Sequence, residues 1–206
     1  MNAETIHIAL KDYPMIEDFS RAGTGEYALV ERCREGDITA FRDLYERYKR
    51  SLFSLAHRFH GNTADAEDSI QEAFIHIYRG LPGFRHESRL ETWLYRIVTN
   101  TCISRTRSRR STEEHFDAGV EENHPAEPSS ATDVLLRDLL EKEITTLPPQ
   151  QRAVFLLYAV HEQTHPDIAE TLGISVGTSK SAYHRAREAL KTRLAHHGIQ
   201  NSESLT

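Results

Sequence analysis

The chain has 206 residues, of which 38% are hydrophobic, and a formal net charge of −6 at pH 7. Its two cysteines, Cys33 and Cys102, have no partner spacing, so neither a disulfide framework nor a thiolate metal site is indicated. No segment approaches the roughly 18 apolar residues of a membrane span and the first residues do not resemble a signal peptide, so we expect a cytoplasmic protein without membrane insertion.

Three amphipathic helices are predicted in the first part of the chain, after an acidic N-terminal extension (1–25) to which no role is assigned. Apolar residues recur every three or four positions from 37 to 59, which is typical of one helix face, and Gly61 ends that helix. Asn62 or Thr63 caps the next helix, which breaks at 80–83. The stretch 88–91 then fits a capping box that starts a third helix.

Residues 111–132 are acidic, polar and rich in Pro and Ser, so we expect a flexible linker there. A second helical unit follows over 133–197 and ends in a short tail, 198–206. No window shows sustained two-residue alternation with turn signals, so no sheet is predicted. The expected fold is all-α, with two small helical domains joined by a flexible linker, the second with a helix-turn-helix.

The stretch 160–173 supports two conflicting functions. His161, Glu162 and His165 spell HExxH, the signature of zinc metalloproteases, which needs both histidines on one uninterrupted helix. Pro166 directly follows the second histidine and disfavours a helical conformation there, but suits the first position of a new helix. We therefore expect the histidines to straddle a helix-loop-helix junction, with no metal site.

The same window fits a helix-turn-helix. Ala169 is small enough for two helices to cross closely, and Gly173 suits a turn that needs a positive φ. Ser175 can cap the next helix, which runs from Val176 to about 196. Its expected buried stripe consists of Ala182, Ala186, Leu190 and Leu194.

Two basic stretches frame the acidic linker. Residues 85–110 carry seven arginines against two glutamates, and residues 180–193 carry five Lys or Arg against one Glu. Residues 111–133 carry seven acids and neither Lys nor Arg. Each basic run alone is most simply a solvated helix face, but two of them suggest two contacts with a polyanion.

The whole chain resembles the extracytoplasmic-function (ECF) sigma factors of bacterial RNA polymerase, in the sigma-70 family. The resemblance rests on DAEDSIQEAFIHIYRGLPGF, ESRLETWLYRIVTNTCISRTRSRR, LPPQQRAVFLLY and IAETLGISVGTSKSAYHRAREALKTRL, in the order of the family. It implies sigma region 2 over 26–110 and region 4 over 133–197. It also implies core RNA polymerase, promoter DNA and an anti-sigma factor as partners, no cofactor, and no enzyme activity or catalytic residue.

The resemblance also implies roles for individual residues. Those expected to dock on the polymerase are Asp65, Glu67, Asp68, Gln71 and Glu72. Those expected to contact the minus-ten element, partly through a flipped-out base captured by the loop 84–89, are Phe84, Arg85, Arg89, Tyr95, Arg96, Asn100, Arg105 and Arg107. Those expected to contact the minus-thirty-five element are Ser175, Thr178, Lys180, Ser181, His184, Arg185 and Lys191. Trp93 and Tyr95, beside the minus-ten loop, could equally be core residues, and for Trp93 the core role is the one we expect.

The sequence departs from the family in places. His165 and Pro166 stand where an acid or a Tyr-Glu pair is usual, and Ala182 replaces a frequent Arg, which removes one expected phosphate contact. The alternatives are a stand-alone helix-turn-helix regulator, which leaves the acidic helix and the minus-ten loop unexplained, and the zinc peptidase.

Overall fold

The computed structural model describes residues 24–113 and 131–197, and within these two ranges every regular element is helical. The N-terminal unit consists of α2 (Thr24–Arg34), α3 (Ile38–His60), α4 (Thr63–Gly80), the short 3-10 turn η2 (Leu81–Gly83) and α5 (Leu90–Glu113). The C-terminal unit consists of α6 (Ala131–Thr145), α7 (Pro149–Ala159), α8 (His165–Leu172) and α9 (Val176–His196). The all-α prediction is confirmed.

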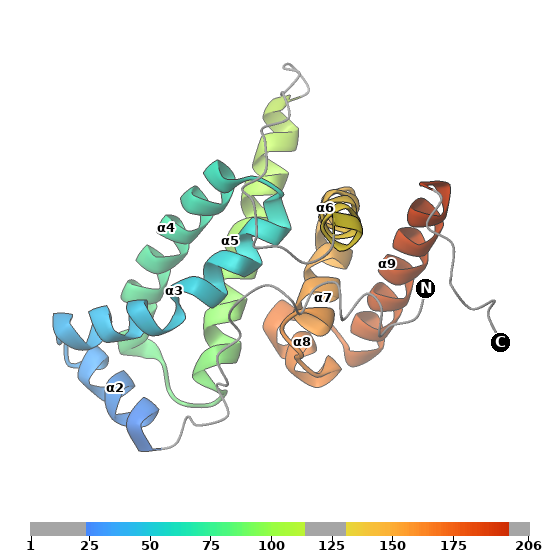
Figure 1. Cartoon of the computed structure of the whole chain (residues 1–206). Helices are drawn as coiled ribbons and strands as arrows, with labels where there is room; N and C mark the ends of the chain where they lie inside the picture. Colours follow the sequence, from blue (N-terminus) through green and yellow to red (C-terminus); the bar gives the residue numbers. More distant parts are fainter. Residues whose placement is uncertain (1–23, 114–130, 198–206) are drawn as a thin grey trace.

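Local capping chemistry sets the predicted helix ends. Asp37 caps α3 by accepting from two backbone N–H groups, and Gly61 closes it with φ 76°. Asn62 caps α4 by accepting from the Asp65 N–H. The capping box expected at 88–91 predicts that α5 begins at Arg89, but the helix begins one residue later, at Leu90. Helix α2 was not predicted, and it covers one end of α3 (Figure 1).

The core of the N-terminal unit forms where α3, α4 and α5 pack together (Figure 1). The fully buried side chains Leu44, Leu55 and Phe59 project from α3 into this core, and Ile77 and Leu94 meet them from α4 and α5. Trp93 is also buried, as expected, and packs against Gly80 and Phe84. A long amphipathic α3 flanked by two helices therefore gives the unit one contiguous apolar centre.

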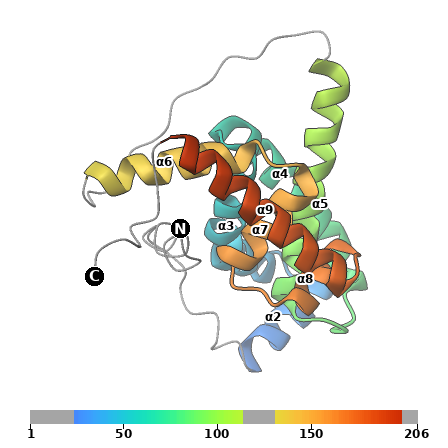
Figure 2. The ribbon, with the colours of Figure 1, turned by 90° about the vertical axis from the view of Figure 1, so that its right-hand side faces the viewer.

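The C-terminal unit packs α6 and α7 across α9, with α8 at one end (Figure 2). The predicted stripe of α9 is confirmed, since Ala182, Ala186, Leu190 and Leu194 are all buried. The predicted linker, 111–132, falls largely outside the described residues, and the N-terminal extension and tail do so too. No helix in the described ranges is long and apolar enough to cross a membrane.

The two units lie directly against each other (Figure 1). Helices α3 and α5 of the N-terminal unit contact α6, α7 and α8 of the C-terminal unit. At the centre of this contact is Arg152 on α7, whose side chain is almost completely buried. Its guanidinium donates to the Phe59 carbonyl at 2.6 Å and lies over the Phe59 ring.

Candidate functional site

The HExxH stretch falls on a junction between two helices, as predicted. Helix α7 ends at Ala159 and α8 begins at His165, so Pro166 occupies the second position of α8 rather than the expected first. Between them, Glu162 has φ 51°, a left-handed conformation that interrupts any continuous helix. His161 Nδ1 lies 2.8 Å from the Tyr95 hydroxyl, and His165 Nδ1 lies 2.9 Å from Ser179 Oγ.

The two histidines therefore face different partners instead of one metal ion. Burial and the nearby charge of Arg58 lower the pKa of His161 to about 3, so this ring is neutral at pH 7. Among the described residues, no group of three or more His, Cys, Asp or Glu side chains is arranged to hold a metal ion.

The helix-turn-helix is formed by α8 and α9. Thr164 and Asp167 make a reciprocal capping box at the start of α8, and Gly173 ends it with φ 63°. Ser175 caps α9 by accepting from the Thr178 N–H, and the two hydroxyls also share a hydrogen bond of 2.8 Å. Both of these predicted minus-thirty-five residues thus also fix the start of α9.

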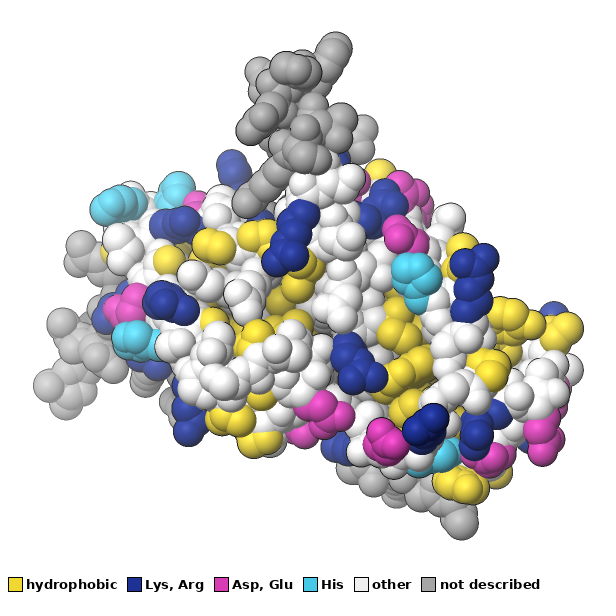
Figure 3. All heavy atoms as spheres, turned by 180° about the vertical axis from the view of Figure 1, so that it is seen from behind, with side chains coloured by type: hydrophobic (Ala, Val, Ile, Leu, Met, Phe, Trp, Pro, Cys, Tyr) yellow, Lys and Arg dark blue, Asp and Glu magenta, His cyan; other side chains and the backbone are white. Residues whose placement is uncertain are grey.

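The other predicted minus-thirty-five residues lie on exposed parts of α9: Lys180, Ser181, His184, Arg185 and Lys191. The first four form two pairs spaced by four residues, which places them side by side on one face. This face lies opposite the buried alanines and leucines, so it is free to enter a groove of DNA. Lys and Arg side chains are spread over both units on the face seen in Figure 3, rather than gathered in one patch.

The loop between η2 and α5 has a strained backbone. His86 adopts φ 56°, which is uncommon for a residue with a side chain and is typical of positions held by their surroundings. Its ring stacks on Tyr27 of α2, with ring centroids 4.5 Å apart, and its Nε2 lies 2.9 Å from Glu31 Oε1. The hydrogen bond from His86, with a second from Arg34, lowers the pKa of the Glu31 carboxyl.

Phe84 packs on the buried side of the same loop. It is 5% exposed and packs against Trp93 and His86, with ring centroids 5.2 Å and 4.9 Å away. Around Phe84 the loop forms a hollow of about 340 Å³. Its lining comprises Gly83, Phe84, Arg85, Glu87, Ser88, Trp93, Arg96 and Glu170. The hollow combines aromatic, hydroxyl and guanidinium groups, which are suited to holding an unstacked base, with the carboxylates of Glu87 and Glu170, which repel a phosphate.

The remaining predicted minus-ten residues occupy different environments along α5. Asn100 and Arg107 are exposed, and so is Arg89 at the start of the helix. Tyr95 is instead 2% exposed, with its hydroxyl 2.6 Å from Ser51 Oγ as well as bonded to His161. In this arrangement Tyr95 belongs to the contact between the two units.

The predicted polymerase-docking acids lie on α4 and pair with arginines of α5. Arg105 contacts Asp68 at 2.7 Å and Glu72 at 3.3 Å, and Arg109 contacts Asp65. Glu67 and Gln71 are exposed. The acids of α4 therefore neutralise part of the basic stretch of α5 that is expected to hold DNA phosphates.

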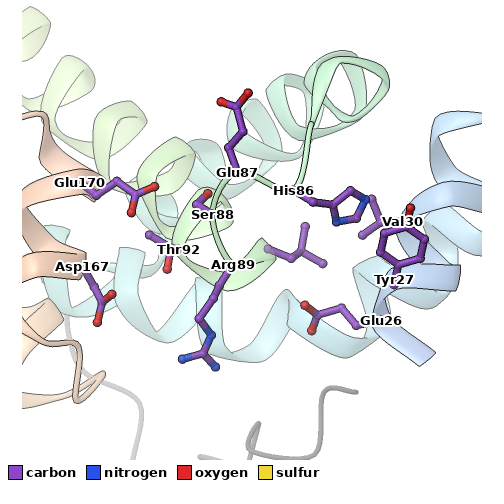
Figure 4. A pocket seen from close by; sticks show the side chains of 11 residues that line it. Glu26, Tyr27, Val30, His86, Glu87, Ser88, Arg89, Thr92, Asp167 and Glu170 are labelled. Atoms are coloured by element: carbon purple, nitrogen blue, oxygen red, sulfur yellow. The ribbon is translucent and has the colours of Figure 1, made fainter. Parts of the chain in front are cut away.

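Two groups of residues escaped the sequence reasoning. Tyr27, Glu31 and His86 shape the minus-ten loop, and no local pattern links α2 to residues 55 positions further along the chain. Asp167 and Glu170 of α8 reach the same loop from the C-terminal unit and line a second hollow of about 570 Å³ (Figure 4). Only the packing of the two units brings these acids there.

Comparison with known proteins agrees with this architecture. Residues 44–112 match the family model Sigma-70 region 2, and residues 137–190 match Sigma-70, region 4. The chain is 34% identical to the ECF RNA polymerase sigma factor SigW of Bacillus subtilis, over 80% of this chain and 94% of SigW. It is also 34% identical to the ECF RNA polymerase sigma-E factor of Escherichia coli K12, over 82% of this chain and 94% of that protein.

Among solved structures, the chain is similar to the sigma factor RpoE of Bartonella quintana in complex with the anti-sigma factor NepR. The TM-score is 0.63 at 25% identity, covering 77% of this chain and 98% of RpoE. CnrH, solved with the cytosolic domain of CnrY, has the same fold, with a TM-score of 0.62 at 24% identity. The chain therefore belongs to the ECF sigma factors of the sigma-70 family.

Proposed function

We propose that this chain acts as an alternative sigma factor that binds core RNA polymerase, directs it to promoters and helps to melt the DNA. This proposal rests on two features that occur together in one chain. One is a loop suited to an unstacked base, and the other is a capped helix-turn-helix with an exposed polar and basic face. A stand-alone helix-turn-helix regulator needs only the second. We propose no catalytic role and no cofactor.

The direct test is run-off transcription with core polymerase on genomic fragments, starting with the promoter of the protein's own gene. We expect discrete transcripts that depend on the added chain. DNA binding without dependence on core polymerase would instead support the stand-alone regulator.

In this proposal the N-terminal unit serves as region 2 and reads the melted minus-ten element. The loop hollow receives a base, Asn100 reads a neighbouring base edge, and Arg85, Arg89, Arg96 and Arg107 hold phosphates. Arg105 also contacts a phosphate once its ion pairs with Asp68 and Glu72 of α4 are broken. Phe84 supports the loop from inside, and Tyr95 becomes available only if the two units separate.

The acidic face of α4 is proposed to dock on a basic surface of core polymerase. Glu67→Lys is expected to weaken core binding by roughly tenfold, about 1.4 kcal/mol, because it places like charges together at an interface. Asp138→Lys is the matched control, since it makes the same charge change at an exposed position of α6. Fluorescence titration of both variants against core enzyme measures the difference. Equal affinities would show that α4 is not the docking surface.

The exposed face of α9 is proposed to read the duplex minus-thirty-five element. Arg185→Ala is expected to cost roughly 1–3 kcal/mol and to relax preference at one upstream position, as for a bidentate guanine contact. Lys191→Ala is expected to weaken binding evenly across sequences and to lower the salt slope by about one. Binding to a library randomised upstream, at two salt concentrations, separates them. An even loss for Arg185→Ala would make Arg185 a phosphate contact only.

An anti-sigma factor is also a proposed partner. Two solved proteins with a similar fold support this proposal. RpoE was solved with the anti-sigma factor NepR, and CnrH with the cytosolic domain of CnrY.

A further inference from the structure

The second histidine of the HExxH stretch fastens one end of the helix-turn-helix. His165 is the first residue of α8, and its Nδ1 lies 2.9 Å from Oγ of Ser179, at the end of the first turn of α9. The opposite end of α8 is joined to α9 by the turn at Gly173 and Ser175. A turn alone leaves the angle between two helices adjustable, whereas α8 is held against α9 at both of its ends.

Aromatic rings keep the imidazole of His165 in place. It stacks on the ring of Tyr158 of α7, with ring centroids 4.6 Å apart and an interplanar angle of 19°. The ring of Tyr183 of α9 lies edge-on to the imidazole, with centroids 6.0 Å apart, and packs on Tyr158 at 4.4 Å. Such pairs favour particular ring orientations. Helices α7, α8 and α9 therefore meet at one ring, whose nitrogen lies beside the Ser179 hydroxyl.

The hydroxyl of Ser179 makes this contact inside the C-terminal unit. Ser179 is 0% exposed, and a buried hydroxyl without a hydrogen-bond partner is unfavourable. When the imidazole is removed, the hydroxyl can turn to the carbonyl of Ser175, four residues earlier in the chain, a bond that tends to bend a helix. The contact with His165 therefore keeps the first turn of α9 in one position.

The His165–Ser179 contact lies next to the exposed face of α9. Lys180 directly follows Ser179, and Arg185 lies five residues further on. Hydrogen bonds to base edges need a narrow range of distances and angles, so a small shift of α9 weakens them. Attraction between a charged side chain and a phosphate falls off gradually with distance and tolerates the same shift better.

The imidazole is suited to act through its position rather than through charge. Burial, with a smaller effect of the charge on Lys180, lowers the pKa of His165, so the ring is neutral at pH 7. A neutral ring that is already hydrogen-bonded to Ser179 adds no cation to the DNA-facing side of α9.

We propose that His165 is a positioning residue for minus-thirty-five recognition. Through the Ser179 hydroxyl it fixes α9 relative to α8, and so sets which base edges Lys180 and Arg185 reach. In a helix-turn-helix the first helix crosses the phosphate backbone while the second enters the major groove, so the angle between them decides how the second helix lies in the groove. The inference rests on the proposed function, in which α9 reads the minus-thirty-five element.

The test uses holoenzyme assembled from core polymerase and the full chain. The parent selects a preferred upstream sequence from a library randomised over the minus-thirty-five region, and the ratio of its affinities for that sequence and for the whole library is then measured. Ser179→Ala and His165→Ala are each expected to lower this ratio roughly tenfold, the size of one good base contact. The salt slope should stay the same, because the contacts with phosphates are retained.

The ratio separates positioning from a general loss of stability. A variant with a smaller folded fraction binds every upstream sequence less well by the same factor, so its ratio does not change. Ser69→Ala is the matched control, since Ser69 is equally buried and its Oγ lies 2.8 Å from Nε2 of His60 in the N-terminal unit. We expect its ratio to equal that of the parent. Circular dichroism verifies helix content, and if His165→Ala loses helix, the smaller change Ser179→Ala carries the test.

A conservative replacement tests the hydrogen bond itself. Asn in place of His165 keeps a hydrogen-bonding group near the position of Nδ1 and removes the stacked ring. His165→Asn is therefore expected to recover part of the ratio that His165→Ala loses. In the background of Ser179→Ala, where the hydroxyl is gone, the same replacement should bring no recovery.

The outcomes distinguish the inference from the proposed function. An unchanged ratio in Ser179→Ala and His165→Ala, or an equal loss for every upstream sequence, overturns the positioning role while the preference of the parent still supports reading by α9. Failure of His165→Asn to recover any of the ratio overturns it as well, because the hydrogen bond is then not the cause. A parent holoenzyme without any upstream preference overturns the proposed minus-thirty-five reading itself.

Discussion

Replacement of Arg152 by alanine is expected to lower the free energy of unfolding by about 3–5 kcal/mol, because it leaves three backbone carbonyls without their donor and each unsatisfied buried acceptor costs roughly 1–3 kcal/mol. The side chain is 4% exposed. Its guanidinium donates to the carbonyls of Phe59, Thr145 and Leu147. These carbonyls lie at or just beyond the C-terminal ends of α3 and α6, where no helical N–H is available to them.

Arg152→Ala leaves these acceptors without their donor and also removes the cation from the Phe59 ring, 4.9 Å away. Urea unfolding followed by circular dichroism measures the loss. Arg79→Ala, at an exposed position of α4, is the control and should change stability by less than about 0.5 kcal/mol. A loss below about 1 kcal/mol for Arg152→Ala would mean that water replaces the guanidinium and that the network contributes little.

The helices and their ends could be predicted from sequence because they depend on neighbouring residues. Ser175 and Gly173 mark the turn of the helix-turn-helix through side-chain capping and a left-handed backbone, both of which act within three residues. Pro166 marks the junction between α7 and α8 for the same reason, although it lies at the second position of α8 rather than the first. Local rules were less exact at α5, where the helix begins after Arg89 instead of after Ser88.

The contact between the units could not be predicted in this way. Arg152 and Phe59 are 93 residues apart, and a buried arginine that bonds backbone carbonyls has no periodic signature. Tyr95 matched a family position for DNA contact, and nothing in its neighbourhood indicated a bond to His161, 66 residues away. Side chains expected to face DNA are therefore partly covered by the chain's own second unit.

The contact between the two units is expected to depend on pH. His161 is held beside Tyr95 of α5, whose own pKa is raised by burial, and within the field of Arg58 of α3. Burial, with a smaller effect of Arg58, lowers the pKa of His161 to about 3. Separation of the two units, which gives an open form in place of the closed form seen in Figure 1, exposes the ring to water, where its pKa returns to about 6.5. The open form therefore binds a proton more readily than the closed form.

Because the pKa is depressed in the closed form, closure is fully favoured above about pH 6.5 and is progressively lost as the pH falls toward 3. Between pH 7.5 and 4.5 the ratio of open to closed chains is expected to rise by about a hundredfold, equivalent to about 2.7 kcal/mol. Energy transfer between dyes on two introduced cysteines, His76→Cys on α4 and Ala195→Cys on α9, both at exposed positions, measures the ratio across this pH range.

His161→Ala identifies the group responsible. This variant should be more open than the parent at pH 7.5, because Tyr95 loses one partner, and its opening should depend much less on pH. It retains His60, whose pKa burial also lowers, to about 4, and any slope that remains in the variant belongs to His60 and to other titrating groups. Equal pH dependence in parent and variant would show that His161 stays buried when the units separate.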